Sequence, residues 1–179
     1  MEWLVISVAI IAIGLFAWNY AARSNPMKVG QPAPDFRLPD QQGKTYTLTD
    51  FQGKWLAIYF YPKDDTPGCT KQACMFRDDL YRLAELGADV IGVSVDDTDS
   101  HADFAKKYNL QFPLLADSEG EVTARYHSLI NLGLMKFARR NTFLIDPHGR
   151  IARIYLSASA ARNSGEIIGD LKQMQISSV

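Results

Sequence analysis

Two apolar runs constrain the fold of this chain more than any other feature. Residues 55–61 (WLAIYFY) and 88–95 (ADVIGVSV) are long enough for strands and carry few polar side chains, as strands buried on both faces do. The segment between them predicts a helix from about Pro67 to Leu86, stopped by Gly87. A strand, a helix and a second strand in this order predict an α/β fold.

Shorter patterns extend this fold on both sides. A hairpin is expected where residues 36–38 and 45–48 flank a turn-rich stretch. The other expected elements are a helix over 100–108 with Ser100 as its N-cap and Asp103 in the capping-box position, a strand over 113–116, a helix over 118–126, strands over 142–145 and 151–157, and a helix over 164–174. Together they predict a mixed central sheet with helices on both faces.

A charge-free block stands at the start of the chain. Residues 3–22 carry no charged side chain, and as a helix they would be about 30 Å long, enough to cross a bilayer. A cleaved signal peptide is one alternative, but no basic side chain precedes the block. A buried core helix is another, disfavoured because the block is apolar on every face. We therefore expect a transmembrane anchor, or an uncleaved signal, over residues 1–22.

The block divides the chain into an anchor (1–22), a linker (23–34) and a globular part (35–179). The linker holds three prolines and one glycine. The cations after the block are Arg23, Lys28 and Arg37. By the positive-inside rule they predict a membrane-anchored protein with its globular part on the cytoplasmic side. A net charge of −1 and the lack of a basic run argue against nucleic acid as a partner.

The only two cysteines, Cys69 and Cys74, mark the candidate reactive site. Two cysteines are too few for a disulfide scaffold and cannot by themselves complete a four-ligand zinc site. Cys69 falls in the first turn of the predicted helix, where unpaired N–H groups and the helix dipole favour a thiolate. It also follows the carboxyl end of a buried strand, where open α/β sheets carry their active sites.

A thiolate at Cys69 needs a fixed cation, because Asp64 and Asp65 nearby would raise the pKa of the thiol. The candidate cations are Lys63, Lys71, Arg139 and Arg140. We interpret the two aspartates as turn-forming residues. The three histidines are expected at the surface: His101, His127 and His148.

Cys74 lies on the same predicted helix as Cys69, five residues further along. In an ideal helix two such Cα atoms are about 8.6 Å apart, whereas a disulfide needs roughly 4.4–6.8 Å. The two sulfurs therefore cannot pair while the first turn is helical, and pairing would require that turn to unwind. The alternative interpretation is that both cysteines are buried as small apolar side chains.

Pro62, Thr66 and Cys69 are spaced as in the active-site motif of the peroxiredoxins, and TPGCTKQAC resembles the branch called peroxiredoxin Q or bacterioferritin comigratory protein. The resemblance covers about residues 29–175. Further matching stretches are FPLLAD (112–117) and RNTFLIDPHGRI (140–151). Residues 128–139 depart from the pattern, and an anchor is not general in the branch.

The resemblance implies a thioredoxin-like fold and the reduction of hydrogen peroxide and organic hydroperoxides. It implies that Cys69 attacks the peroxide and that Cys74 resolves the product as an intramolecular disulfide. Arg140 would stabilise the thiolate and the peroxide oxygens, Thr66 would hydrogen-bond the sulfur or peroxide, and Pro62 would shield the site from water. Thioredoxin or a similar dithiol would recycle the enzyme as a monomer or weak homodimer, without a metal or organic cofactor.

Two other functions fit less well. A membrane-tethered thiol–disulfide oxidoreductase would carry the usual CxxC spacing, which is absent. A non-enzymatic redox sensor would need a second domain to pass on its signal, and the sequence shows none. Residues 135–137, inside the departing stretch, are interpreted as a packed loop, with an exposed contact to a membrane or partner as the alternative.

Overall fold

A mixed five-stranded sheet forms the middle of the computed structural model, which describes residues 27–177. Its strands are β3 (Trp55–Phe60), β4 (Ala88–Ser94), β5 (Leu114–Ala116), β8 (Thr142–Ile145) and β9 (Ile151–Tyr155). They lie in the order β5-β4-β3-β8-β9, with parallel pairing from β3 to β5 and antiparallel pairing from β3 to β9. The predicted mixed sheet is confirmed.

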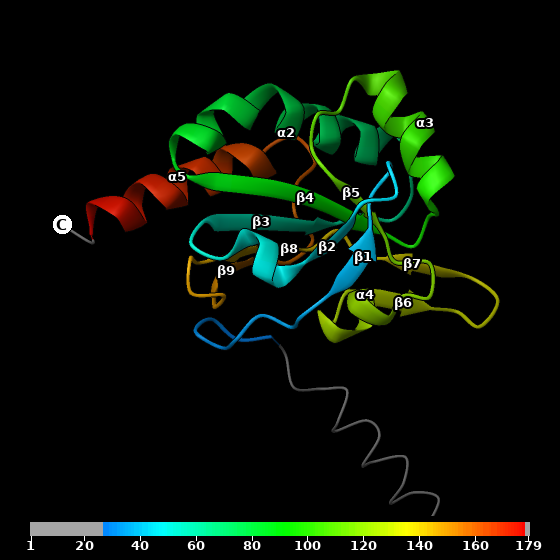
Figure 1. Cartoon of the computed structure of the whole chain (residues 1–179), viewed down its shortest axis with the longest axis horizontal. Coiled ribbons are helices and arrows are strands. Elements are labelled where there is room, and N and C mark those ends of the chain that lie inside the picture. Colours follow the sequence, from blue (N-terminus) through cyan, green and yellow to red (C-terminus); the bar gives the residue numbers. More distant parts are fainter. Residues whose placement is uncertain (1–26, 178–179) are drawn as a thin grey trace, which may run out of the picture.

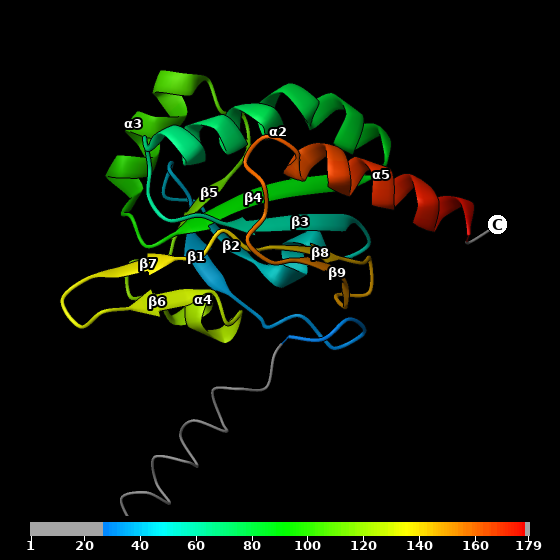
Figure 2. The same ribbon diagram turned by 180° about the vertical axis from the view of Figure 1, so that it is seen from behind.

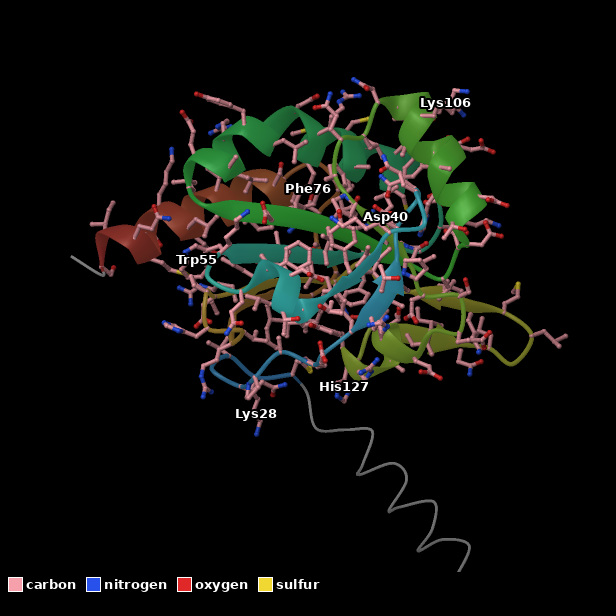
Figure 3. The ribbon with its side chains drawn as sticks, viewed as in Figure 1. Lys28, Asp40, Trp55, Phe76, Lys106 and His127 are labelled. Atoms are coloured by element: carbon pink, nitrogen blue, oxygen red, sulfur yellow. The ribbon has the colours of Figure 1, made fainter. Side chains whose placement is uncertain are left out.

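One face of the sheet is covered by three helices, α2 (Pro67–Glu85), α3 (Thr98–Tyr108) and α5 (Asn163–Ile176) (Figure 1). Side chains alternate along β3, so Ala57 and Tyr59 point to this face. They pack with Phe76 of α2, which Figure 3 shows between its helix and β4. The carboxyl end of β3 leads directly into the loop before α2.

The opposite face of the sheet carries shorter elements (Figure 2). They are β1 (Arg37–Pro39), β2 (Thr45–Thr47), the 3-10 helix η1 (Leu48–Phe51), α4 (Glu121–Arg125), β6 (Leu129–Asn131) and β7 (Lys136–Ala138). Leu56, Ile58 and Phe60 of β3 point into this second core. The second face is thus covered mainly by hairpins, because its one α-helix spans only five residues.

Several elements differ from the sequence-based predictions, and α4 and β9 are shorter than expected. Helix α3 begins at Thr98 and not at Ser100, because Asp97 is the N-cap and its carboxylate accepts from the Ser100 amide (2.8 Å). Strands β6 and β7 form a hairpin where a packed loop was expected. Met135 is exposed, so the predicted packing is wrong for that residue, whereas Phe137 is partly buried; Leu132 and Leu134 at the hairpin tip are exposed as well.

The predicted membrane-anchored location is not upheld. Within residues 27–177, no helix is both long and apolar enough to cross a bilayer. The predicted anchor, 1–22, lies outside these described residues, and the division of the chain at residues 22 and 34 stays a prediction. The described end of the predicted linker is bonded to the body, since Gly30 and Ala33 donate backbone hydrogen bonds to Ile151 and Gly149 (2.7 and 2.9 Å).

Candidate active site

The first turn of α2 sets the position of Cys69. Thr66 is the N-cap in an extended conformation and Pro67 is the first helical residue, where its missing N–H is not needed. The first intrahelical bond runs from the Thr70 amide to the Thr66 carbonyl (2.8 Å). The amides of Gly68 and Cys69 therefore belong to the unpaired N-terminal end of the helix, whose partial positive charge favours an anion.

Arg140 is the cation that reaches the cysteine. The sulfur of Cys69 is buried, with 1% of the residue exposed, and Arg140 Nη2 lies 3.5 Å from it. The other candidate cations, Lys63, Lys71 and Arg139, are exposed. Arg140 immediately precedes β8, the strand paired with β3, and so the sheet brings it to the start of α2.

Arg140 is fixed by two acceptors on α2. Its Nη1 donates to the Gly68 carbonyl (3.2 Å) and to Oε1 of Gln72 (2.8 Å). Gln72 is completely buried, and its Nε2 donates to Oδ1 of Asn163 (3.0 Å). Sequence reasoning missed both amides. The available signal was helical spacing, because Gln72 follows Cys69 by three residues and so lies on the same buried face.

The contact between Arg140 and α2 is close. A Cβ atom added at Gly68 would lie 2.9 Å from Arg140 Nη2, a separation that would force the guanidinium to move. A glycine at this position therefore lets the arginine approach the helix start closely.

Cys74 lies further along α2 and is half-buried, and both cysteines are free thiols. Because α2 is continuous from Pro67 to Glu85, the turn between them is helical. Tyr59 packs beneath this turn, and its pKa is raised well above the ordinary value, first by burial and then by the charges of Asp64 and Cys69. The predicted separation of the two cysteines by an intact helix turn is thus present.

Pro62 and Arg140 line a pocket of about 420 Å³. The remaining lining residues are Ile130, Phe137, Ala138, Arg139, Ser157 and Ala158. Three of these eight residues belong to the β6–β7 hairpin, in the stretch that departs from the family pattern. Thr66 lies at the same helix start, and its hydroxyl donates to the Lys63 carbonyl (3.0 Å). Because a hydroxyl has only one proton, Thr66 must rotate before it can donate to a sulfur or a peroxide.

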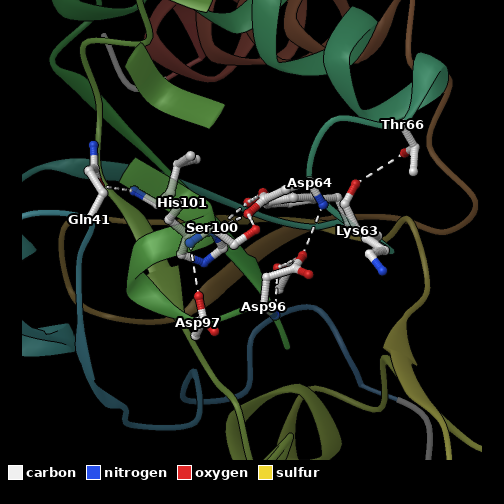
Figure 4. A network of polar contacts seen from close by, with 11 residues as sticks. Gln41, Lys63, Asp64, Thr66, Asp96, Asp97, Ser100 and His101 are labelled. Atoms are coloured by element: carbon white, nitrogen blue, oxygen red, sulfur yellow. Dashed lines mark hydrogen bonds and ion pairs between the residues drawn. The ribbon is translucent and has the colours of Figure 1, made fainter. Parts of the chain in front are cut away.

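Asp64 and His101 form a buried cluster that sequence reasoning missed (Figure 4). Both Tyr61 Oη and Ser100 Oγ donate to the Asp64 carboxylate (2.7 Å each), and His101 Nδ1 lies 2.7 Å from it. His101 is completely buried, so the expected surface position is wrong. The available signal was its spacing of three residues before Phe104, on the buried face of α3.

Asp65 anchors the same loop from the outside. Its carboxylate accepts from Lys107 Nζ and Tyr108 Oη of α3 (2.6 Å each), and these bonds hold its pKa below the usual value. Asp65 also has a φ of 55°, which accounts for the predicted turn. The two aspartates therefore attach the active-site loop to α3, a role beyond turn formation.

Within residues 27–177, no group of three potential metal-ligating side chains gathers.

Comparison with known proteins identifies the family. Residues 29–154 match the family model described as AhpC/TSA family. The chain is 41% identical over 149 residues to a putative peroxiredoxin bcp of Coxiella burnetii, covering 81% of this chain and 99% of the relative. The chain belongs to the peroxiredoxin Q/Bcp family.

Two solved structures of this family have the same fold. Peroxidoxin BcpB of Mycobacterium tuberculosis superposes with a TM-score of 0.78 at 33% identity, over 82% of this chain and 97% of its own. The Xanthomonas campestris bacterioferritin comigratory protein, described for its alkyl peroxide reduction activity, gives 0.74 at 30% identity over 83% and 97%. The predicted thioredoxin-like fold is confirmed, and this peroxiredoxin is a thiol-dependent peroxidase.

The same comparisons bear on the membrane prediction. The family model matches residues 29–154 and so begins after the charge-free block, and the Coxiella peroxiredoxin aligns over 99% of its length with only 81% of this chain. We therefore withdraw the predicted membrane-anchored location.

Proposed function

We propose that Cys69 is the peroxide-attacking thiolate of this peroxidase and that Arg140 stabilises it. The observation that carries this proposal is the 3.5 Å contact between Arg140 Nη2 and the buried Cys69 sulfur at the N-terminal end of α2. An arginine stays protonated at physiological pH, and a helix start adds partial positive charge. Both favour the charged form of the thiol, which is the nucleophile.

The same arginine has donors left for the peroxide. Three of its hydrogen bonds go to Gly68, Gln72 and the Cys69 sulfur. Arg140 has five N–H donors, so one on Nη2 and the one on Nε have no partner in the described chain. We assign these two to the peroxide oxygens. Donors held in place are most effective where charge develops, and here it develops on the departing oxygen.

In the proposed first step the Cys69 thiolate attacks one peroxide oxygen. A sulfur–oxygen bond forms, the oxygen–oxygen bond breaks, and the departing hydroxide or alkoxide takes up a proton to leave as water or alcohol. The sulfur is oxidised to a sulfenic acid and the peroxide is reduced. Pro62 shields this site from water, and Thr66 donates to the sulfur or peroxide after its hydroxyl turns from Lys63.

In the second step the Cys74 thiol attacks the Cys69 sulfenic acid. A sulfur–sulfur bond forms and water leaves. The first turn of α2 unwinds for this step, since the intact turn holds the two residues too far apart. Thioredoxin or a similar external dithiol then reduces the disulfide by thiol–disulfide exchange, which restores both thiols. We propose that the enzyme works as a monomer or weak homodimer.

The pocket beside Arg140 supports a substrate range that includes organic hydroperoxides as well as hydrogen peroxide. Its walls include the apolar side chains of Pro62, Ile130, Phe137 and Ala158. An apolar wall next to a fixed cation suits a molecule with an apolar tail and a polar peroxide end. The alkyl peroxide activity of the Xanthomonas relative supports the same range.

Substitution of the two cysteines tests the proposal. Reduced Cys69→Ser should lose peroxide consumption, because its oxygen is a far weaker nucleophile at neutral pH. Cys74→Ser should consume about one equivalent of hydrogen peroxide per chain and then stop as a sulfenic acid, which dimedone traps for mass spectrometry. The wild type should turn over repeatedly with thioredoxin and its reductase.

Other results would contradict specific parts. Full activity in Cys69→Ser would remove Cys69 from the attacking role. Absence of a Cys69–Cys74 disulfide from the peroxide-treated wild type would exclude Cys74 as the resolving residue and leave the first step intact.

A further inference from the structure

Asn163 is the first residue of α5 and lies behind the active site. The mechanism proposed above gives it no role. Asn163 is completely buried, and its Oδ1 accepts two hydrogen bonds, from Gln72 Nε2 (3.0 Å) and from Thr142 Oγ1 of β8 (2.7 Å). A hydrogen-bonded chain therefore runs from α5 through Gln72 to Arg140 and ends at the Cys69 sulfur.

The chemistry of this chain fixes which way each amide points. A guanidinium only donates, so Gln72 must turn its oxygen to Arg140. Its nitrogen then faces Asn163, which must present oxygen in return. Turning the Asn163 amide would set its nitrogen against the nitrogen of Gln72. The observed orientation leaves Asn163 Nδ2 buried without a partner among the described residues, so the oxygen contacts prevail over that loss.

The position of Gln72 in the sequence couples this chain to the helix turn. Gln72 lies between Cys69 and Cys74, so unwinding that turn withdraws it from its buried site. Once withdrawn, its amide can bond water. The bond between Gln72 and Asn163 therefore exists only in the helical form and stabilises that form against the unwound one.

We propose that Asn163 is a positioning residue that acts through Gln72 on both steps of the cycle. By holding Gln72 it holds Arg140 at the sulfur, which speeds the attack on peroxide. By the same bond it stabilises the wound turn, which slows disulfide formation. The inference rests on the proposed roles of Cys69, Cys74 and Arg140. It adds a residue of α5 that sets the rate of peroxide attack relative to the rate of disulfide formation.

Asn163→Ala should change the two rates in opposite directions. Attack on peroxide should slow about tenfold and disulfide formation should quicken about tenfold, because an unpaired buried donor at Gln72 weakens only the helical form. Rapid mixing of the reduced full chain with one equivalent of hydrogen peroxide, followed by quenching and mass spectrometry, measures both rates. Asn163→Leu removes the same acceptor but keeps a similar side-chain volume. It should change both rates in the same way, and it replaces the alanine variant if that variant folds poorly.

Ser164→Ala is the matched control. Ser164 is the next residue of α5, is also buried, and donates to Asp79 of α2 (2.7 Å), beyond the segment that unwinds. The Ser164→Ala substitution removes a hydrogen bond between α2 and α5 but leaves the hydrogen-bonded chain from Asn163 to Arg140 intact. Both rates should stay within about twofold of the wild type, whatever the loss of stability, because additivity holds for sites without shared partners.

The proposal is overturned if both rates fall together in the Asn163 variants, if neither changes in a folded variant, or if Ser164→Ala reproduces the opposite changes. These outcomes differ from a failure of the proposed function, which the Cys69→Ser and Cys74→Ser variants report independently.

Discussion

At the scale of single residues, the site depends on how closely one guanidinium approaches one helix turn. Gly68 lets Arg140 reach both the Gly68 carbonyl and the Cys69 sulfur. A methyl group there would lie 2.9 Å from Nη2, and the flexible arginine would move before the helix backbone did. A larger side chain at this position should therefore lower the activity without lowering the stability.

Gly68→Ala should slow the attack on peroxide by roughly tenfold to a hundredfold, because a displacement of about 1 Å has effects of this size. Its thermal stability should not fall, since alanine favours a helix more than glycine does. Gly165→Ala in the first turn of α5 is the control, because a Cβ there meets nothing within 4 Å. Equal peroxide rates for the two variants would contradict the steric account. Stopped-flow kinetics and thermal unfolding supply the measurements.

The sequence motif predicted Cys69, Arg140, Pro62 and Thr66 as site residues, and the structure brings all four close to the start of α2. It did not identify the residues that hold them. The bond between Gln72 and Asn163 joins amides 91 residues apart, and the contact between Asp64 and His101 spans 37. Such pairs form no local pattern, since their partners are decided by tertiary packing. Only helical spacing marked one member of each pair as buried.

At the scale of elements, α3 holds the loop that leads into α2. The loop carries Asp64 inward to His101 and Asp65 outward to Lys107. Both aspartates near Cys69 are thus bonded by groups of α3. The outer contact is exposed and its carboxylate titrates, so it can be tested by pH.

Asp65→Asn keeps a residue type that tolerates the left-handed backbone while removing the charge. The pKa of Asp65 is lowered on folding, first by the Lys107 bond, so the pair stabilises the fold above the ordinary pKa of an aspartate. That stabilisation is lost as the pH falls through the lowered pKa. The wild type should therefore be more stable than the variant at pH 7, and the difference should vanish in acid.

Urea unfolding of both proteins at neutral and acid pH, with and without added salt, measures this difference. Salt should reduce it, because exposed ion pairs are screened. A stability difference between the two proteins that changes with neither pH nor salt would mean that Asp65 acts through its backbone conformation alone.

The long elements could be predicted, and so could the short strands β1, β2 and β5, but the β6–β7 hairpin could not. The runs over β3, β4 and α2 are long enough for their apolar patterns to identify the type of element. The β6–β7 hairpin has strands of three residues each, and its tip exposes Leu134 fully. No burial pattern marks such a hairpin in the sequence, although it supplies part of the pocket wall.

At the scale of the whole molecule, the sheet separates two cores, and aromatic side chains pack in both. Tyr59 and Tyr61 lie in the core beneath α2, Tyr126 lies in the opposite core, and Tyr155 packs at the edge of the first. The pKa of each of these four tyrosines is raised, with burial as the largest cause. The packing that builds the fold thus also keeps these hydroxyls protonated.

This predicts the response to alkali. Because the folded pKa values lie above the ordinary value near 10, stability is unaffected below about pH 10 and falls as the pH rises beyond it, since only the unfolded chain readily releases these protons. The share of the tyrosinate absorbance that comes from these four side chains should therefore rise together with the loss of the far-ultraviolet circular dichroism signal in a pH titration. Complete ionisation before any loss of helix signal would contradict the burial of these four side chains.

The burial of Cys69 has a consequence for the reductant of the proposed cycle. With 1% of the residue exposed in the helical form, the sulfur is out of reach of a protein dithiol. In the cycle proposed above, the reductant therefore engages only the unwound, oxidised enzyme, because disulfide exchange needs access to the sulfur. Reduced enzyme then does not compete for the reductant, however abundant it becomes. In the proposed cycle, refolding of one helical turn would thus prevent product inhibition at that step.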